Sequence, residues 1–371
     1  MEVNSIGLPS INNAKGDKRA FLPSFIKKLK NYDVDVFLEK GYGAGMGFSE
    51  SDYIVDNERV KFVNRDEVFG KDLVIVLKAP GISDIKKMKR KSGLISMLHY
   101  ETREELTNIL RKNEINSFSM DSITDDKGKR MVVTYEKTAE GGVFSTIDEM
   151  ERRRDDFYSP DRGPYNVVVL GMGNLGIAAG KSFFSYLNKK VIENSSEENV
   201  SECIVSYIEK DSISNKDEFK KIFNNTDVLV DATKRQDFSE YIITNELIEY
   251  LKKDSIILDL TADPYDTSKS PIQVKAIEGI PTGDLNKYIF EIDEKEYDDI
   301  PAIVNTKHRR TVISCSGWPG IFPESTMEIY EDELVPFLEV LMNNGMEVSI
   351  DSGNIYERAL YRSTVGYFDK E

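Results

Sequence analysis

The sequence predicts an α/β protein made of two units, each built around a largely parallel sheet. Short apolar runs rich in Val, Ile and Leu alternate with amphipathic helical segments along most of the chain. A polar, charged stretch at residues 148–165 divides this alternation into two halves. The 371 residues are also enough for two domains of ordinary size.

The first half is expected to contain four strands and two helices. The runs at 72–78 and 94–100 are nearly continuous in apolar residues, which is typical of strands that are covered on both faces. In chain order the expected elements are a helix and then a strand within 21–39, strands at 72–78 and 94–100, a helix at 103–115 and a strand at 117–123.

The second half repeats the pattern after a connection whose first part could be helical. An apolar strand runs directly into a helix within 166–187. Further strands are expected at 226–233 and 255–264, with a helix at 243–254 between them. A long helix at 328–345 ends at Gly345, a residue that commonly closes helices.

Composition excludes several classes of partner. The net charge of −16 argues against nucleic acids and anionic membranes, because both need a basic face. Cys203 and Cys315 are too few for a disulfide framework and indicate a reducing compartment. With only two histidines besides, no metal site is expected. No apolar run approaches membrane-spanning length and the N-terminus lacks a signal-peptide core, so the expected location is the cytoplasm.

A glycine loop opens the second half. VVVLGMGNLG places Gly171, Gly173 and Gly176 in a G-x-G-x-x-G pattern between an apolar strand and a helix rich in Ala and Gly. The first glycine permits a tight turn, the second lets the backbone approach a pyrophosphate, and the third allows close packing of helix on strand. The loop, with Asn174 and Leu175, is therefore expected to bind a dinucleotide at the helix N-terminus.

The sequence leaves the choice of dinucleotide open. NAD-binding domains usually carry an acid at the end of the second strand, about 20 residues beyond the loop. Glu193 and Asn194 fall near that distance. If the helix continues further, the second strand is 203–211 and the acid is Glu209 or Asp211. Either placement favours NAD as the cofactor, with NADP as the alternative.

Taken as a whole, the chain resembles the alanine dehydrogenase, pyridine nucleotide transhydrogenase and saccharopine dehydrogenase family. The matching stretches occur in the family's order: GDKRAFLP, GYGAGMGFSESDY, VLKAP, MLHYE, the glycine loop, DLTADP and WPGIFPEST. The resemblance implies two Rossmann-like domains with a cleft between them, the first domain discontinuous. Residues 1–147 and 318–371 would form the substrate (catalytic) domain, and 148–317 the dinucleotide-binding domain.

The same resemblance implies four active-site residues. Arg19 would hold the substrate carboxylate, since a guanidinium binds carboxylates bidentately. Lys78 would bind a carboxylate or carbonyl oxygen or act as a base, and His99 would transfer a proton. Asp263 would orient the amine beside the cofactor. The implied partner is a small amino acid or 2-oxo acid, and a homo-oligomer is ordinary for the family.

Several positions depart from the family pattern. Gly317 and Trp318 replace an Asn-Met pair beside the nicotinamide, and residues 134–142 lack the family's serine. Asp121 and Arg130 stand where saccharopine-type enzymes have Glu and Arg, and could recognise a dicarboxylic or basic substrate. The long stretch between Asp263 and Pro319 also points to that type.

Two functions of different class therefore follow. The first is an NAD(P)-dependent oxidoreductase acting at the C–N bond of an amino acid's α-carbon, either by alanine-type deamination or by condensing a 2-oxo acid with a diamino acid. The second is a non-catalytic homologue that only binds a dinucleotide. The complete set of Arg19, Lys78, His99 and Asp263 favours the enzyme.

Overall fold

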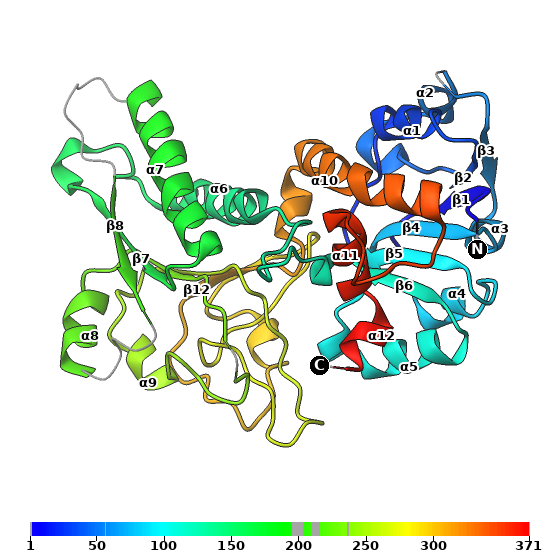
Figure 1. Ribbon diagram of the computed structural model, residues 1–371. Coiled ribbons are helices and arrows are strands. Elements are labelled where there is room, and N and C mark those ends of the chain that lie inside the picture. The colour runs from blue at the N-terminus through cyan, green and yellow to red at the C-terminus, as the bar shows by residue number, and fades with distance from the viewer. Residues whose placement is uncertain (1, 56, 195–202, 210–215, 236, 371) are drawn as a thin grey trace. The chain divides into compact units, whose positions relative to one another are not determined.

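The computed structural model describes every residue except 1, 56, 195–202, 210–215, 236 and 371 (Figure 1). The chain divides into two compact units, of which the first joins Met1–Thr134 to Phe322–Glu371 and the second is Tyr135–Ile321. Both are α/β units with mainly parallel sheets, and the first is discontinuous, so the predicted fold class is confirmed.

The first unit holds six parallel strands in the order β3-β2-β1-β4-β5-β6. The order places β1 and β4 at the centre, which is the Rossmann-like arrangement. The strands of this sheet are β1 (Ser5–Leu8), β2 (Asp35–Glu39), β3 (Val60–Val63), β4 (Leu73–Lys78), β5 (Gly93–Met97) and β6 (Asn116–Ser119).

Helices cover both faces of this sheet, as the apolar runs predict. In β4, Leu73 and Ile75 belong to one core and Val74 and Val76 to the other. The helices are α1 (Pro23–Leu29), α2 (Glu50–Ile54), α3 (Arg65–Phe69), α4 (Ile82–Ile85), α5 (Glu104–Lys112), α10 (Pro323–Asn344), α11 (Ile355–Arg362) and α12 (Val365–Phe368).

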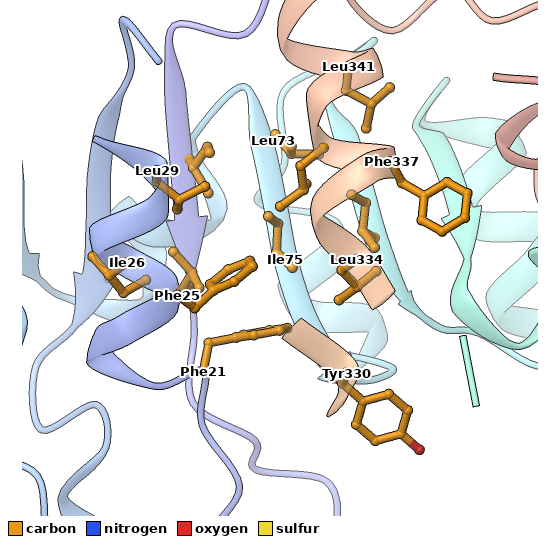
Figure 2. Close-up of a cluster of buried hydrophobic side chains, with 14 of the residues drawn as sticks. Phe21, Phe25, Ile26, Leu29, Leu73, Ile75, Tyr330, Leu334, Phe337 and Leu341 are labelled. Carbon is orange, nitrogen blue, oxygen red and sulfur yellow. The ribbon is translucent and has the colours of Figure 1, made fainter. Parts of the chain in front are cut away.

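The C-terminal helix α10 completes the core of the N-terminal segment. Figure 2 shows Leu334 and Phe337 of α10 and Phe25 of α1 among the side chains that pack over β4. Gly345 ends α10 with a φ of 75°, as expected from its position. The first unit therefore cannot bury its core without the last 50 or so residues of the chain.

The second unit holds six strands in the order β11-β12-β10-β9-β7-β8, all parallel except β11. Two cores lie on its two faces, one containing Val167 and Val169 and the other Val168 and Leu170. The strands are β7 (Tyr165–Leu170), β8 (Cys203–Ile208), β9 (Val228–Asp231), β10 (Ile256–Asp259), β11 (Ile289–Phe290) and β12 (Thr311–Ser314).

Helices α6 and α7 pack against each other on one face of the second sheet (Figure 1). α6 runs without a break through the boundary that the sequence places at 147/148, because Ala139, Val143 and Ile147 are buried along one stripe. The units therefore divide at 134/135 and 321/322. The helices are α6 (Tyr135–Arg153), α7 (Asn174–Asn194), α8 (Lys216–Phe223) and α9 (Asn245–Ile248).

Two features are absent from the described residues. None of the helices combines the length and the apolar character that crossing a membrane requires. Among the same residues, no group of three or more His, Cys, Asp or Glu side chains is arranged to hold a metal ion.

Candidate active site

Arg19 lies just before α1 and forms a buried ion pair that the sequence does not show. Its Nε and Nη2 donate to the two carboxylate oxygens of Asp17 over 2.9 Å and 2.6 Å. Both side chains are at most 2% exposed. Burial alone would raise the pKa of Asp17, but the bonds and charge of Arg19, with the charge of Lys78, hold that pKa below its usual value.

Lys78, His99 and Asp121 all lie at the carboxyl edge of the first sheet. Lys78 is the last residue of β4, His99 follows the end of β5 by two residues, and Asp121 follows the end of β6 by two. In parallel α/β sheets this edge is where ligands bind. The sequence pattern and the structure therefore bring three of the predicted residues to one edge.

Asp121 holds His99 at two points. Its Oδ1 accepts a hydrogen bond from the backbone N–H of His99 over 3.3 Å, and its Oδ2 lies 3.4 Å from the ring nitrogen Nδ1. His99 has a left-handed backbone with a φ of 49°, which is uncommon for a residue with a side chain. One carboxylate thus fixes both the strained backbone and the ring.

Three cations act on His99 in addition to Asp121. Loss of water around the partly enclosed ring lowers the pKa of His99 most, and Asp121 opposes this shift. The charges of Arg103, Lys78 and Arg130 lower the pKa further. The ring is 43% exposed, so it can still exchange protons with a ligand or with water.

Arg103 and Arg130 add donors to this cluster. The guanidinium of Arg103 makes no hydrogen bond or ion pair within the described part of the chain, although burial lowers its pKa and Asp121 opposes that shift. Arg130 donates from Nη2 to the Val132 carbonyl over 3.3 Å, while its buried Nε has no hydrogen-bond partner among the residues that the structure describes. It lies at the base of a hairpin closed by a bridge to Thr124.

The glycine loop lies at the carboxyl end of β7 and leads into α7. Gly171 has a φ of 94°, which a side chain would strain. A Cβ on Gly176 would lie 2.1 Å from the carbonyl oxygen of Gly171, so only glycine fits there. A Cβ on Gly173 would have no neighbour within 4 Å, so this part of the backbone faces open space, as does the exposed Asn174. Leu175 packs against the core below.

The structure decides between the two expected positions of the second strand. α7 continues to Asn194, so Glu193 lies in a helix, and the second strand is β8. Glu209 follows β8 directly and is exposed. It therefore occupies the place where an acid usually meets an adenosine ribose. Asp211, the alternative, lies outside the described residues.

Gly317 and Trp318 are both buried, and their place beside the nicotinamide stays a prediction. Trp318 is 1% exposed, and its Nε1 donates to the carbonyl oxygen of Asp259 over 2.8 Å. Glycine at 141 lets α6 approach Trp318 closely, because an added Cβ would lie 2.4 Å from the Trp318 carbonyl oxygen. The buried indole therefore has a packing role in the core of the second unit.

A cluster of buried charged side chains lies at the carboxyl edge of the second sheet. Asp231 and Asp259 are register partners at the ends of β9 and β10. Lys275 donates to Asp259 over 2.7 Å, and both side chains are at most 2% exposed. Burial and then the charge of Asp259 raise the pKa of Asp231, whereas Lys275 counteracts burial and holds the pKa of Asp259 low.

Asp263 lies four residues beyond the end of β10 and pairs with a residue that sequence reasoning missed. Its Oδ2 lies 2.7 Å from Nη2 of Arg235, whose side chain is 1% exposed. Asp17, Arg103 and Lys275 were missed as well.

Comparisons with known proteins agree with this architecture. Residues 12–137 match the family model described as "Alanine dehydrogenase/PNT, N-terminal domain". The chain is 23% identical over 273 residues to "Alanine dehydrogenase 1" of Staphylococcus aureus, covering 67% of this chain and 70% of that protein. The resemblance to alanine dehydrogenases and transhydrogenases is therefore confirmed.

Two solved structures show the same fold. An L-alanine dehydrogenase superposes with a TM-score of 0.73 at 19% identity, covering 97% of this chain and 94% of the other. A transhydrogenase from Sinorhizobium meliloti gives a TM-score of 0.67 at 13% identity, with 97% of each chain covered. The chain thus has the two-domain Rossmann-like fold of these proteins.

Proposed function

We propose that the protein is an NAD(P)-dependent oxidoreductase that acts on the C–N bond at the α-carbon of an amino acid. The observation that carries the proposal is the cluster of His99, Lys78, Asp121 and the Asp17–Arg19 pair at one sheet edge. The similarity to alanine dehydrogenases supports the same reaction type.

The glycine loop fits a dinucleotide. Gly173 leaves open space at the N-terminus of α7, where backbone N–H groups and the helix dipole favour a pyrophosphate. Glu209 is placed to accept from a ribose hydroxyl, which favours NAD over NADP. When bound, the nicotinamide exchanges a hydride with the α-carbon of the substrate.

We assign roles from the geometry of each group. Lys78 and Arg19 together bind the substrate carboxylate, with Asp17 offsetting one of their charges. His99, oriented by Asp121, moves a proton at the oxygen or nitrogen that leaves or attacks the α-carbon. Asp263 orients the amine. In the reductive direction a 2-oxo acid, ammonium, NADH and a proton give the amino acid, NAD⁺ and water.

Absorbance of NADH and NADPH tests this proposal directly. Pyruvate, 2-oxoglutarate and glyoxylate are each offered with ammonium, lysine or ornithine. We expect turnover that is lost in H99N and K78M and kept in H308N. His308 lies in a loop, and among the described residues its hydrogen bonds involve its backbone groups alone. If no substrate pair oxidises either nucleotide although both bind, the chain is a non-catalytic dinucleotide-binding protein.

A second candidate function is the condensation of a 2-oxo acid with a diamino acid. Arg103 and Arg130 add two guanidinium groups beside His99. Together with Lys78 and Arg19 they give more positive charge than a substrate with a single carboxylate requires. Asp121 could bind a distal ammonium group. Turnover with ammonium alone supports deamination of the alanine type, whereas turnover only with lysine or ornithine supports condensation.

A homo-oligomer and a cytoplasmic location stay predictions.

A further inference from the structure

Asp263 lies on a loop that the structure holds in a strained conformation. The preceding residue, Ala262, has a φ of 52°, in the left-handed region that residues with side chains rarely adopt. The Asp259 carboxylate fixes this turn, because its Oδ1 accepts hydrogen bonds from the backbone N–H groups of Thr261 and Ala262 over 3.1 Å and 2.8 Å. The backbone of Asp263 is thus positioned from within the core.

Arg235 positions the side chain of Asp263 in turn. Its Nη2 donates both to Oδ2 of Asp263 and to the Val274 carbonyl, each over 2.7 Å, and its Nη1 donates to the Glu240 carbonyl over 3.0 Å. Its guanidinium carbon lies 5.1 Å from the centre of the Phe238 ring. These contacts leave the guanidinium no freedom to follow a moving carboxylate.

The two oxygens of Asp263 have different surroundings. Oδ2 is engaged by Arg235, whereas Oδ1 makes no hydrogen bond to any residue that the structure describes. The side chain is 22% exposed, so a ligand can reach it. One oxygen is therefore anchored and the other is available as an acceptor.

We propose that Arg235 is a positioning residue for the reaction: it anchors one oxygen of Asp263 so that the other accepts a hydrogen bond from the substrate's amine. The inference rests on the proposed function. An arginine suits this task because its planar fork can bond Asp263 and two carbonyls at once, which the single ammonium of lysine cannot do in the same geometry. Within the described part of the chain, the buried Nε of Arg235 has no hydrogen-bond partner, so the printed bonds of this side chain all come from Nη1 and Nη2.

The test compares R235Q, R235K, D263N and the double variant R235Q/D263N by steady-state kinetics with the best substrate pair. We expect R235Q to lower kcat by about tenfold or more and to leave KM for the dinucleotide unchanged, as the loss of a charged hydrogen bond would. R235K should recover part of kcat. The double variant should be no slower than D263N, because both changes remove the same interaction.

R310Q is the matched control for stability. Arg310 is a buried arginine that also bonds backbone carbonyls, those of Leu251 and Lys252, without contacting a proposed site residue. We expect R310Q to lower the Tm as R235Q does but to keep kcat. A wild-type kcat in R235Q, or additive effects of the two changes in the double variant, would overturn the positioning role of Arg235 but not the proposed function. A wild-type protein without turnover would overturn the proposed function and this role together.

Discussion

At the scale of single residues, the contact between Asp121 and His99 leads to a prediction about the pKa of the imidazole. The carboxylate raises the pKa of the imidazole, while burial and three neighbouring cations lower it. In D121N the amide oxygen can still accept from the backbone N–H of His99, but the negative charge is gone. We therefore expect the pKa of His99 to fall further below its ordinary value.

An NMR titration of the imidazole protons measures this change. The protein has two histidines, so H308N assigns both signals. D125N is the control, because the hydrogen bonds of the Asp125 side chain to described residues all come from backbone N–H groups of its own turn. A His99 pKa that is equal in D121N and wild type would show that Asp121 exerts no charge effect on the ring.

Sequence patterns predict single residues where a residue ends an apolar run. The resemblance to known enzymes supplied Lys78, His99 and Asp263. The strand pattern supports them, because each lies at or shortly after the end of a buried strand and a parallel sheet collects its strand ends at one edge. The pairing of Arg19 with Asp17 and of Asp263 with Arg235 could not be predicted, because a buried ion pair in irregular chain leaves no periodic signal.

At the scale of elements, the turn from β7 to α7 contains two glycines with opposite requirements. An alanine at 176 would press its Cβ against the Gly171 carbonyl, whereas one at 173 would meet nothing within 4 Å. We expect G176A to lower the Tm. We expect G173A to keep the Tm and to weaken NADH binding by about tenfold or more, because its Cβ would stand where the pyrophosphate approaches.

Thermal unfolding and a fluorescence titration with NADH measure the two effects separately. The two variants control for each other, because an unchanged Tm in G173A shows that weaker NADH binding does not come from loss of the fold. NADH binding by G173A that equals wild type would contradict the assignment of the loop as the phosphate site.

Glu331 on α10 links the two parts of the first unit. It is 2% exposed and accepts from the backbone N–H of Leu22, the residue before α1, over 2.5 Å. Burial raises the pKa of Glu331 from 4.5 to about 8, although the Leu22 N–H opposes the shift. The folded state thus binds this proton more tightly than the unfolded state does.

The pH dependence follows from that sign. Stability from the protonated form is complete below pH 4.5 and is lost as pH rises towards 8. The loss is on the order of 1.4 kcal/mol for each unit of pKa difference. Because E331Q keeps the acceptor and cannot ionise, we expect it to be more stable than wild type at pH 8.5 and similar at pH 4.5. Urea unfolding at both pH values measures the free energy of unfolding of each protein. A difference between E331Q and wild type that is the same at pH 4.5 and pH 8.5 would contradict the prediction.

Elements were predicted best where periodicity was strong. The strands expected at 72–78, 226–233 and 255–264 are present as β4, β9 and β10, but they are shorter by one, four and six residues. The helix expected at 243–254 is reduced to α9, Asn245–Ile248. Residues 265–310 have little regular structure, and their composition gave no period from which to predict one.

At the scale of the whole molecule, the last residues of the chain support the edge that carries His99. The Ser363 carbonyl accepts from the Ser119 backbone N–H over 2.8 Å and from the Tyr100 hydroxyl over 3.1 Å. Arg358 and Arg362 both pair with Asp126. We expect a protein that ends at residue 354 to lose protection against hydrogen exchange in 93–126.

Hydrogen exchange read by mass spectrometry tests this prediction. The strands of the second unit, β7 and β10 among them, should exchange as in wild type, and a chain shortened by residues 370–371 alone should behave like the full chain. Unchanged exchange in 93–126 after the larger truncation would show that the C-terminal helices α11 and α12 do not support this edge.

The return of α10 to the first sheet was not derivable from its sequence. An amphipathic helix fits any apolar sheet face, and its pattern does not specify which one. The resemblance to known enzymes supplied that connection, and the core around Phe25, Leu73 and Leu334 gives it a physical basis (Figure 2).

This return has a consequence for synthesis. Residues 1–134 leave the ribosome first but lack α10, whose residues emerge only after the whole second unit. The usual order, in which the N-terminal domain folds first, is therefore reversed: the second unit can close while the first still exposes the apolar surface that α10 will cover. During that interval we expect the nascent N-terminal segment to need protection by chaperones, and this need should end once α10 has been synthesised.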